Sequence, residues 1–169
     1  EQMYVLTNKE YAELVKEQLP DLPEENILLE PVMRNTAPCI AYATYKIGMN
    51  DPEANMIVSP ADHLVLDVKE FERDINLAIE RTSTSDKLVT LGIKPHRPDT
   101  GYGYIQFDAQ QEGKVRRVNK FTEKPPLEEA EAFIKAGNYF WNSGIFIWNY
   151  HNIDRAISSY LPEMKKLFK

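Results

Sequence analysis

The chain has 169 residues, 43% of them hydrophobic, and a formal net charge of −6 at pH 7. Its size suits one domain, and no apolar run approaches the roughly 20 residues that a membrane-spanning helix needs. The negative charge opposes general attraction to nucleic acid or anionic lipid, so we expect neither as a partner, although a local basic pocket could still hold one phosphorylated ligand.

The single cysteine, Cys39, excludes an intramolecular disulfide and a redox pair, and it cannot supply a set of zinc ligands. We expect it to be a small buried hydrophobic side chain. The opening residues EQMYV contain neither the basic segment nor the apolar stretch of a secretory signal. They predict a cytoplasmic protein.

Apolar residues recur at spacings that predict alternating strands and helices in the first part of the chain. The expected strands are residues 3–7, 27–29, 56–58 and 88–93. The expected helices are one between Asn8, its cap, and Pro20, one over residues 36–47 that ends at Gly48, and one over residues 68–79. Such alternation is typical of crossovers between parallel strands, so we expect an α/β fold with a mostly parallel sheet flanked by helices.

Beyond residue 93 the pattern changes, and the sheet is expected to become mixed. Residues 102–107 and 115–121 are strand-like and joined by a polar segment, which predicts a hairpin. A short helix ending at Gly137 and a strand over residues 144–148 follow, and Asn152 is expected to cap a last helix. No linker or repeat divides the chain, so residues 1–169 are interpreted as part of a single domain.

Five segments combine polar residues with glycine or proline at strand ends or helix starts, where ligands bind in open α/β sheets. The first is EPVMRNTAP, residues 30–38. Asn35 or Thr36 can cap the helix that follows, and the free backbone N–H groups there could receive a polar ligand. The alternative is an ordinary cap beside a surface arginine, Arg34.

The second segment is SPADH, residues 59–63, which directly follows a buried strand. Asp62 is placed there to hold Mg²⁺, because that ion needs only a few carboxylate oxygens besides substrate phosphate and water. The alternative is that Asp62 caps the turn or helix that follows. His63 is expected to be packed or hydrogen-bonded, since no second His or Cys stands at the spacing of metal ligands.

The third segment is DTGYGYI, residues 99–105, in which Gly101 and Gly103 permit a ligand to approach the backbone closely. A turn with a bulge is the alternative.

The fourth segment is VNKFTEKPP, residues 118–126. Glu123 can accept from sugar hydroxyls and Lys124 can offer charge to phosphate.

Strict alternation along a strand would place Glu123 and Lys124 on opposite faces, so a shared pocket requires a bulge or turn before Pro125. The alternative is an exposed ion pair of little energetic value. The fifth segment is FWNSGIFIW, residues 140–148, where polar residues interrupt an apolar strand. Asn142 could give a donor and an acceptor to a sugar diol while Gly144 admits the ligand, and the alternative is an edge-strand turn.

The runs RNTAP, PADH, GYGYI, FTEKP and WNSGIFIW, in this order, resemble the middle of mannose-1-phosphate guanylyltransferases from about Leu28 to Pro162. The resemblance implies a Rossmann-like nucleotidyltransferase fold, also called the nucleotide-diphospho-sugar transferase fold, incomplete at both ends. It implies that Asp62 binds a catalytic Mg²⁺ and contacts the nucleotide. The remaining implied contacts are Arg34, Asn35 and Thr36 to guanine and ribose, and Gly103, Glu123, Lys124, Asn142 and Gly144 to the sugar phosphate.

The implied reaction is attack by mannose-1-phosphate on the α-phosphorus of GTP, which gives GDP-mannose and pyrophosphate without a protein nucleophile. Asp62 and Lys124 would be the catalytic residues. Family members also have a glycine- and arginine-rich phosphate loop and a second metal-binding aspartate, which are not found here. We therefore expect an excised, inactive fragment of an enzyme whose full-length form could be a homo-oligomer.

Two alternatives of other kinds stay open. One is a non-catalytic sugar-nucleotide-binding or regulatory module of the same fold, because a fold alone does not fix activity. The other is a metal-dependent glycosyltransferase, which would normally show two aspartates separated by one residue after a strand. The run Asp62-His63-Leu64 lacks the second carboxylate.

Overall fold

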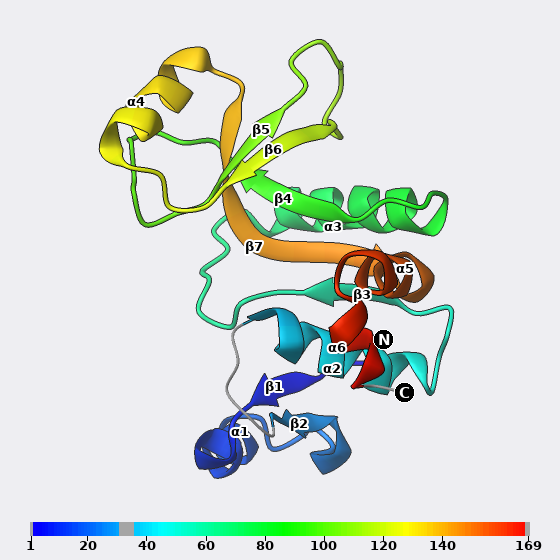
Figure 1. Cartoon of the computed structure of the whole chain (residues 1–169). Helices are drawn as coiled ribbons and strands as arrows, with labels where there is room; N and C mark the ends of the chain where they lie inside the picture. The colour runs from blue at the N-terminus through cyan, green and yellow to red at the C-terminus, as the bar shows by residue number, and fades with distance from the viewer. Residues whose placement is uncertain (1, 31–35, 168–169) are drawn as a thin grey trace. The chain divides into compact units, whose positions relative to one another are not determined.

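The computed structural model describes residues 2–30 and 36–167, with the side chain of Thr36 left out (Figure 1). The chain divides into two compact units, residues 1–56 with 149–169 and residues 57–148. The single domain expected over residues 1–169 stays a prediction. Within the described ranges, none of the helices combines the length and the apolar character that a bilayer crossing requires.

The first unit begins with a strand-helix-strand segment. Strand β1 (Val5–Thr7) pairs in parallel with β2 (Ile27–Leu29), and the connection contains η1 (Lys9–Tyr11), α1 (Ala12–Gln18) and η2 (Glu24–Asn26). Asn8 caps the first turn, because its Oδ1 accepts from the backbone N–H groups of Glu10 at 2.9 Å and Tyr11 at 3.1 Å. The predicted cap and both predicted strands are confirmed.

The rest of the first unit is helical: α2 (Thr36–Gly48), α5 (Tyr150–Tyr160) and α6 (Pro162–Lys166). Gly48 ends α2, as expected. The predicted cap of α5 is wrong, since Asn149 accepts from the N–H of His151 at 2.9 Å and Asn152 is buried inside the helix. The reason is that the preceding strand extends to Asn149, so the helix begins directly where the strand ends.

A five-stranded sheet contains the other strands: β3 (Asn55–Val58), β4 (Val89–Ile93), β5 (Tyr104–Phe107), β6 (Val118–Thr122) and β7 (Tyr139–Asn149). The order is β3-β7-β5-β6, and β4 also pairs with β7. The α/β class with a sheet flanked by helices is confirmed, and so is the β5–β6 hairpin. The pairs β4–β7, β5–β7 and β5–β6 are antiparallel, so the expectation of a mostly parallel sheet does not hold for them.

The difference has a topological cause. Both strands that α3 (Val68–Ser83) connects, β3 and β4, are hydrogen-bonded neighbours of β7. The alternation of strands and helices does predict a crossover from β3 to β4. It does not predict that a strand from much later in the chain pairs with both of them.

The long strand β7 is also the core of the second unit (Figure 1). On α3, Ile75 and Ala78 form a buried cluster with Ile145 and Ile147 of β7. Helix α4 (Leu127–Ala136) contributes Ala130 to a second buried cluster and ends, as predicted, at Gly137 with φ 73°. Because β7 takes part in both clusters, its backbone is held on both sides of residues 142–144.

Candidate functional site

Gly103 lies one residue before β5. Two predicted site residues from other segments, Glu123 and Asn142, lie close to it. The carbonyl of Gly103 accepts from the backbone N–H of Asn142 at 2.8 Å. A Cβ added to Gly103 would lie 2.8 Å from Oε2 of Glu123 and 3.6 Å from Cβ of Asn142. The missing side chain therefore lets the carboxylate of Glu123 come close to the backbone at Gly103, beside Asn142.

Ser143, Gly144 and Ile145 form a bulge inside β7. Gly92 of β4 pairs with Asn142 and Thr90 pairs with Phe146, so one residue of β4 faces three residues of β7. Gly144 has φ 75°, a conformation that glycine adopts without steric cost. The predicted strand over residues 144–148 was therefore too short, because the polar residues lie within an 11-residue strand.

Two hydroxyl groups replace regular ladder bonds at this bulge. Ser143 Oγ donates to the carbonyl of Leu91 at 2.8 Å and accepts from the N–H of Ile145 at 3.1 Å. Thr90 Oγ1 donates to the carbonyl of Ile145 at 2.8 Å. Unpaired backbone groups inside a protein are costly, so these hydroxyls stabilise the bulge. Neither Thr90 nor Ser143 was predicted to have a role of its own, although a polar residue within a strand expected to be buried was a usable signal.

The amide of Asn142 has one end engaged within the protein. Its Oδ1 lies 3.2 Å from Thr90 Oγ1 and 3.3 Å from the backbone nitrogen of Gly144, and both of these groups donate to it. An amide oxygen accepts about two hydrogen bonds, so Oδ1 has no lone pair left for a ligand. Nδ2 has no acceptor among the described residues. Asn142 was predicted to give both a donor and an acceptor to a ligand. In the structure only the donor, Nδ2, is available for one.

The Asp62 segment packs against the same bulge. A Cβ added to Gly144 would lie 3.2 Å from Cγ of Pro60. Asp62 follows β3 in an exposed turn, and its carboxylate has no hydrogen-bond or ion-pair partner in the part of the chain that the structure describes. The cap of α3 is Asp67, whose Oδ1 accepts from the N–H of Glu70 at 2.9 Å, so the alternative role of Asp62 as the cap of that helix is excluded.

Two further observations bear on a metal ion at this turn. His63 is exposed and not packed, so that expectation was wrong; it too has no partner within the described ranges. Those ranges also contain no group of three or more His, Cys, Asp or Glu side chains that could enclose a metal ion. A lone, exposed carboxylate fits an ion that is shared with substrate phosphate and water, which is how Mg²⁺ is commonly bound.

The backbone turns at Lys124, where the sequence required a break in alternation. Strand β6 ends at Thr122, and Lys124 has φ 44°, in the left-handed region, directly before Pro125. The turn leaves Nζ of Lys124 4.0 Å from Oε1 of Glu123, with the side chains 65% and 72% exposed. Such an exposed pair contributes about 0–1 kcal/mol, whereas the backbone strain costs about 1–2 kcal/mol. The ion pair alone therefore does not account for the strained turn.

The loop before Gly103 is held in shape by Asp99. Its carboxylate accepts from the N–H of Gly101 at 2.8 Å and from Nη2 of Arg97 at 2.7 Å. The Gly101 N–H and then the Arg97 guanidinium hold the pKa of Asp99 below its usual value. The backbone carbonyl of Asp99 also accepts from the hydroxyl of Tyr104 at 2.9 Å. The position of Gly103 is thus fixed by bonds on the preceding residues.

The predicted guanine and ribose contacts cannot be placed. Arg34 and Asn35 lie outside the described residues, and Thr36 is described only as the first residue of α2. These roles stay predictions.

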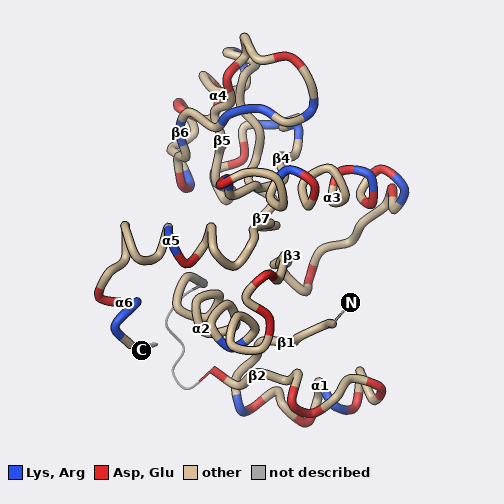
Figure 2. The backbone as a smooth tube through the Cα atoms, turned by 90° about the vertical axis from the view of Figure 1, so that its right-hand side faces the viewer, with Lys and Arg blue, Asp and Glu red and all other residues tan. Residues whose placement is uncertain are grey.

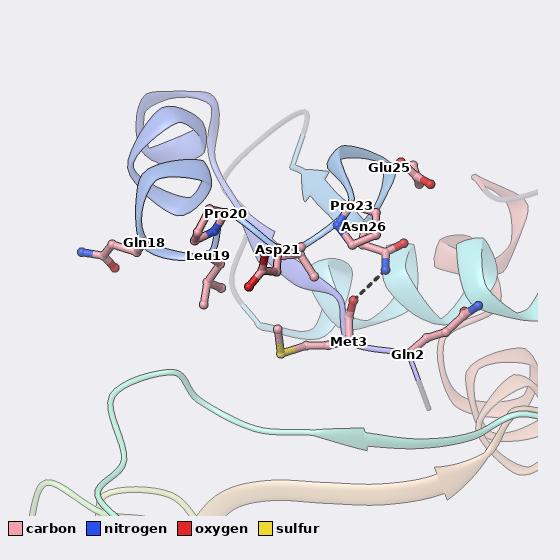
Figure 3. Close-up of a pocket in the computed structure, with 10 residues that line it drawn as sticks. Gln2, Met3, Gln18, Leu19, Pro20, Asp21, Pro23, Glu25 and Asn26 are labelled. Carbon is pink, nitrogen blue, oxygen red and sulfur yellow. Dashed lines mark hydrogen bonds between the residues drawn. The ribbon is translucent and has the colours of Figure 1, made fainter.

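The first unit has a cavity of about 540 Å³ of its own (Figure 3). Polar side chains such as Gln18, Asp21 and Asn26 line it, and Nδ2 of Asn26 donates to the carbonyl of Met3 at 2.9 Å. No residue that the sequence assigned to the site lines this cavity. The residues predicted to contact the metal ion and the sugar phosphate lie instead in the second unit, which comprises residues 57–148.

The nucleotidyl transferase family model matches residues 1–168. The chain is 41% identical to the alginate biosynthesis protein AlgA of Pseudomonas aeruginosa, over 96% of this chain and 33% of that protein. It is also 41% identical to mannose-1-phosphate guanylyltransferase of Escherichia coli K12, over 96% of this chain and 34% of that protein. The chain thus spans about a third of the length of these curated relatives.

A solved structure shares the fold. The crystal structure of a Thermus thermophilus protein, described as a mannose-1-phosphate geranyltransferase, superposes with a TM-score of 0.86 at 27% identity, covering 96% of this chain and 47% of that one. The motif resemblance to mannose-1-phosphate guanylyltransferases is confirmed at the level of sequence identity. By its family match over almost its whole length, the chain belongs to the nucleotidyl transferase family.

Proposed function

We propose that this chain is part of an enzyme that transfers GMP from GTP to mannose-1-phosphate, giving GDP-mannose and pyrophosphate. Support comes from relatives about 40% identical over 96% of the chain that are named for this reaction or for polysaccharide synthesis. The observation in the structure that carries the proposal is that Glu123 and Asn142 come together at Gly103, which has no side chain of its own. We also propose that the enzyme is cytoplasmic.

These residues suit a sugar phosphate. The carboxylate of Glu123 would accept from sugar hydroxyls, Nδ2 of Asn142 would donate to a sugar oxygen, and Gly103, without a side chain, would let the sugar approach the backbone. Lys124 would offer its charge to the phosphate. A phosphate oxygen of the sugar is already an anion at neutral pH, so the protein needs no base and acts by alignment and charge compensation.

Mg²⁺ belongs to the same proposal. Asp62 would hold the ion, because its exposed carboxylate has no partner in the described part of the chain and comes two residues after Pro60, which lies next to Gly144. The bound ion would offset negative charge on the reacting phosphates. Arg34, Asn35 and Thr36 would contact the nucleotide, as the family resemblance implies.

The test is pyrophosphate release by the protein expressed from its complete reading frame, supplied with GTP, mannose-1-phosphate and Mg²⁺. We expect turnover that requires all three and falls when glucose-1-phosphate replaces mannose-1-phosphate or ATP replaces GTP. Tight binding of GDP-mannose without any pyrophosphate release would instead support the regulatory module.

A further inference from the structure

The orientation of the Asn142 amide follows from its neighbours. The backbone N–H of Gly144 can only donate, so the amide atom that it meets at 3.3 Å has to be oxygen. The hydroxyl of Thr90 reaches the same atom at 3.2 Å. If the amide were turned over, one of its N–H groups could still donate to Thr90 Oγ1, but the N–H of Gly144 would face another N–H and lose its acceptor, which is unfavourable in a partly buried position.

The hydroxyl of Thr90 is itself held in place. It lies on β4 and donates to the carbonyl of Ile145 at 2.8 Å, so its single proton is shared between that carbonyl and Oδ1 of Asn142. Thr90 is β-branched, and such side chains have few χ1 rotamers. A hydroxyl can donate or accept, so Thr90 holds the amide in place, while the N–H of Gly144, which can only donate, determines that Oδ1 and not Nδ2 faces it.

We propose that Thr90 is a positioning residue that, together with the backbone N–H of Gly144, holds the amide of Asn142 with Nδ2 free for the substrate. The ligand then has to bring an acceptor to Asn142 and a donor to Glu123, which a pair of sugar hydroxyls provides. This inference rests on the proposed function for the identity of the ligand, a hexose-1-phosphate. The orientation of the amide does not depend on it.

Three variants of the protein from the complete reading frame test the proposal. Thr90→Val removes the hydroxyl at nearly constant shape, and Thr90→Ser keeps it. Ser143→Ala is the matched control, because it removes the other hydroxyl of the bulge, which donates to the carbonyl of Leu91 and not to the Asn142 side chain. KM for mannose-1-phosphate, kcat and the melting temperature are measured for each variant.

We expect Thr90→Val to raise KM for mannose-1-phosphate by roughly tenfold, the scale of one orienting hydrogen bond, with a smaller change in kcat. Thr90→Ser should return KM to within about twofold of the wild type. Ser143→Ala should lower the melting temperature while KM stays within about twofold. An unchanged KM in Thr90→Val, or an equal rise in Ser143→Ala, would overturn the proposal.

A second measurement separates this inference from the proposed function. The side-chain ¹⁵N relaxation of Asn142 is recorded without ligand for the wild type and for Thr90→Val. We expect a rigid amide in the wild type and a mobile one in the variant. If the wild type neither binds nor converts mannose-1-phosphate, the proposed function fails, and an amide equally rigid in both proteins would overturn the role of Thr90.

Discussion

Gly103 and Gly144 serve the candidate site for different physical reasons. Gly144 has φ 75°, so its backbone conformation itself disfavours a side chain. Gly103 is not among the residues with positive φ, but a Cβ there would lie 2.8 Å from the Glu123 carboxylate. Gly144 permits the backbone conformation of the bulge, whereas Gly103 permits the close approach of the Glu123 carboxylate. The sequence predicted both as places of close approach but could not tell these reasons apart.

Gly103→Ala tests whether the sugar approaches the backbone at this residue. The contact would fall on the far end of Glu123, whose side chain is 72% exposed and free to move, so we expect the melting temperature to change by only a few degrees. The methyl group would displace the Glu123 carboxylate and hinder the approach of the sugar to the backbone, so KM for mannose-1-phosphate should rise by roughly tenfold or more. Steady-state kinetics and thermal unfolding measure the two effects. An unchanged KM would show that the sugar binds elsewhere.

Asp62→Asn tests the metal role. Because the carboxylate has no partner within the described ranges, we expect little loss of stability. Turnover should fall by about 100-fold or more, the scale of losing electrostatic stabilisation at a reacting phosphate. Asp67→Asn is the matched control, since it keeps an oxygen to cap α3 and should leave kcat near normal. Near-normal kcat in Asp62→Asn at saturating Mg²⁺ would contradict the assignment.

The left-handed backbone at Lys124 is expected to lower the stability of the protein, while its side chain serves the proposed binding of phosphate. At an ordinary position glycine is less stable than alanine by about 0.5–1 kcal/mol, but at φ 44° that order should reverse. We therefore expect Lys124→Gly to unfold at a higher temperature than Lys124→Ala, while both variants bind mannose-1-phosphate more weakly. Calorimetry and binding isotherms test this. If Lys124→Ala were the more stable variant, the turn would not be strained.

At the scale of elements, charged residues lie both along α3 and in the β5–β6 hairpin (Figure 2), and ion pairs connect the hairpin loop to the helix. Nζ of Lys114 contacts Glu70 and lies 3.0 Å from Asp74. The Lys114 ammonium, followed by the Arg73 guanidinium, holds the pKa of the Glu70 carboxyl below its usual value. A carboxyl with a lowered pKa stabilises the folded state above its unfolded pKa, and that contribution is lost as the pH falls through the folded pKa.

We therefore expect residues 108–117 to lose protection on acidification from about pH 6 to about pH 3, where carboxylates become protonated. Hydrogen exchange, corrected for the intrinsic pH dependence, measures this. Glu70→Gln should produce part of the same loss at neutral pH. Equal protection at both pH values would show that the ion pairs do not hold the loop.

The elements also show how far the sequence could predict the fold. Periodicity located the strands and helices because it depends on neighbouring residues. The place of β7 was not predictable, because its pairing with β4 depends on contacts between residues about 55 positions apart, such as Thr90 and Ile145. For the same reason the motifs indicated Asn142, whereas the hydroxyl of Thr90 that orients it was missed.

At the scale of the whole molecule, the family was predictable from five motifs, and the family match confirms it. The proposed activity depends on the compensation of negative charge. GTP and mannose-1-phosphate together carry several negative charges, while this chain has a net charge of −6 and spans about a third of the length of its relatives. Groups that compensate such charge act as a unit, so partial sets give little turnover.

The chain of 169 residues on its own should accordingly release pyrophosphate near the background rate. The comparison is with the protein from the complete reading frame, under the same concentrations of GTP, mannose-1-phosphate and Mg²⁺. Circular dichroism of both proteins controls for folding. Activity of the 169-residue chain within about tenfold of the complete protein would mean that the active site has been misplaced.

The bulge in β7 restricts how this strand can change in length during evolution. Between its pairings with β4 it contains two more residues than β4 does, an even number. Trp141, Ile145 and Ile147 therefore stay buried at alternate positions on both sides of the bulge. An insertion or deletion of a single residue would turn every later side chain to the opposite face, whereas a change of two would preserve the core. Viable length variants at Asn142–Gly144 should consequently differ by pairs of residues.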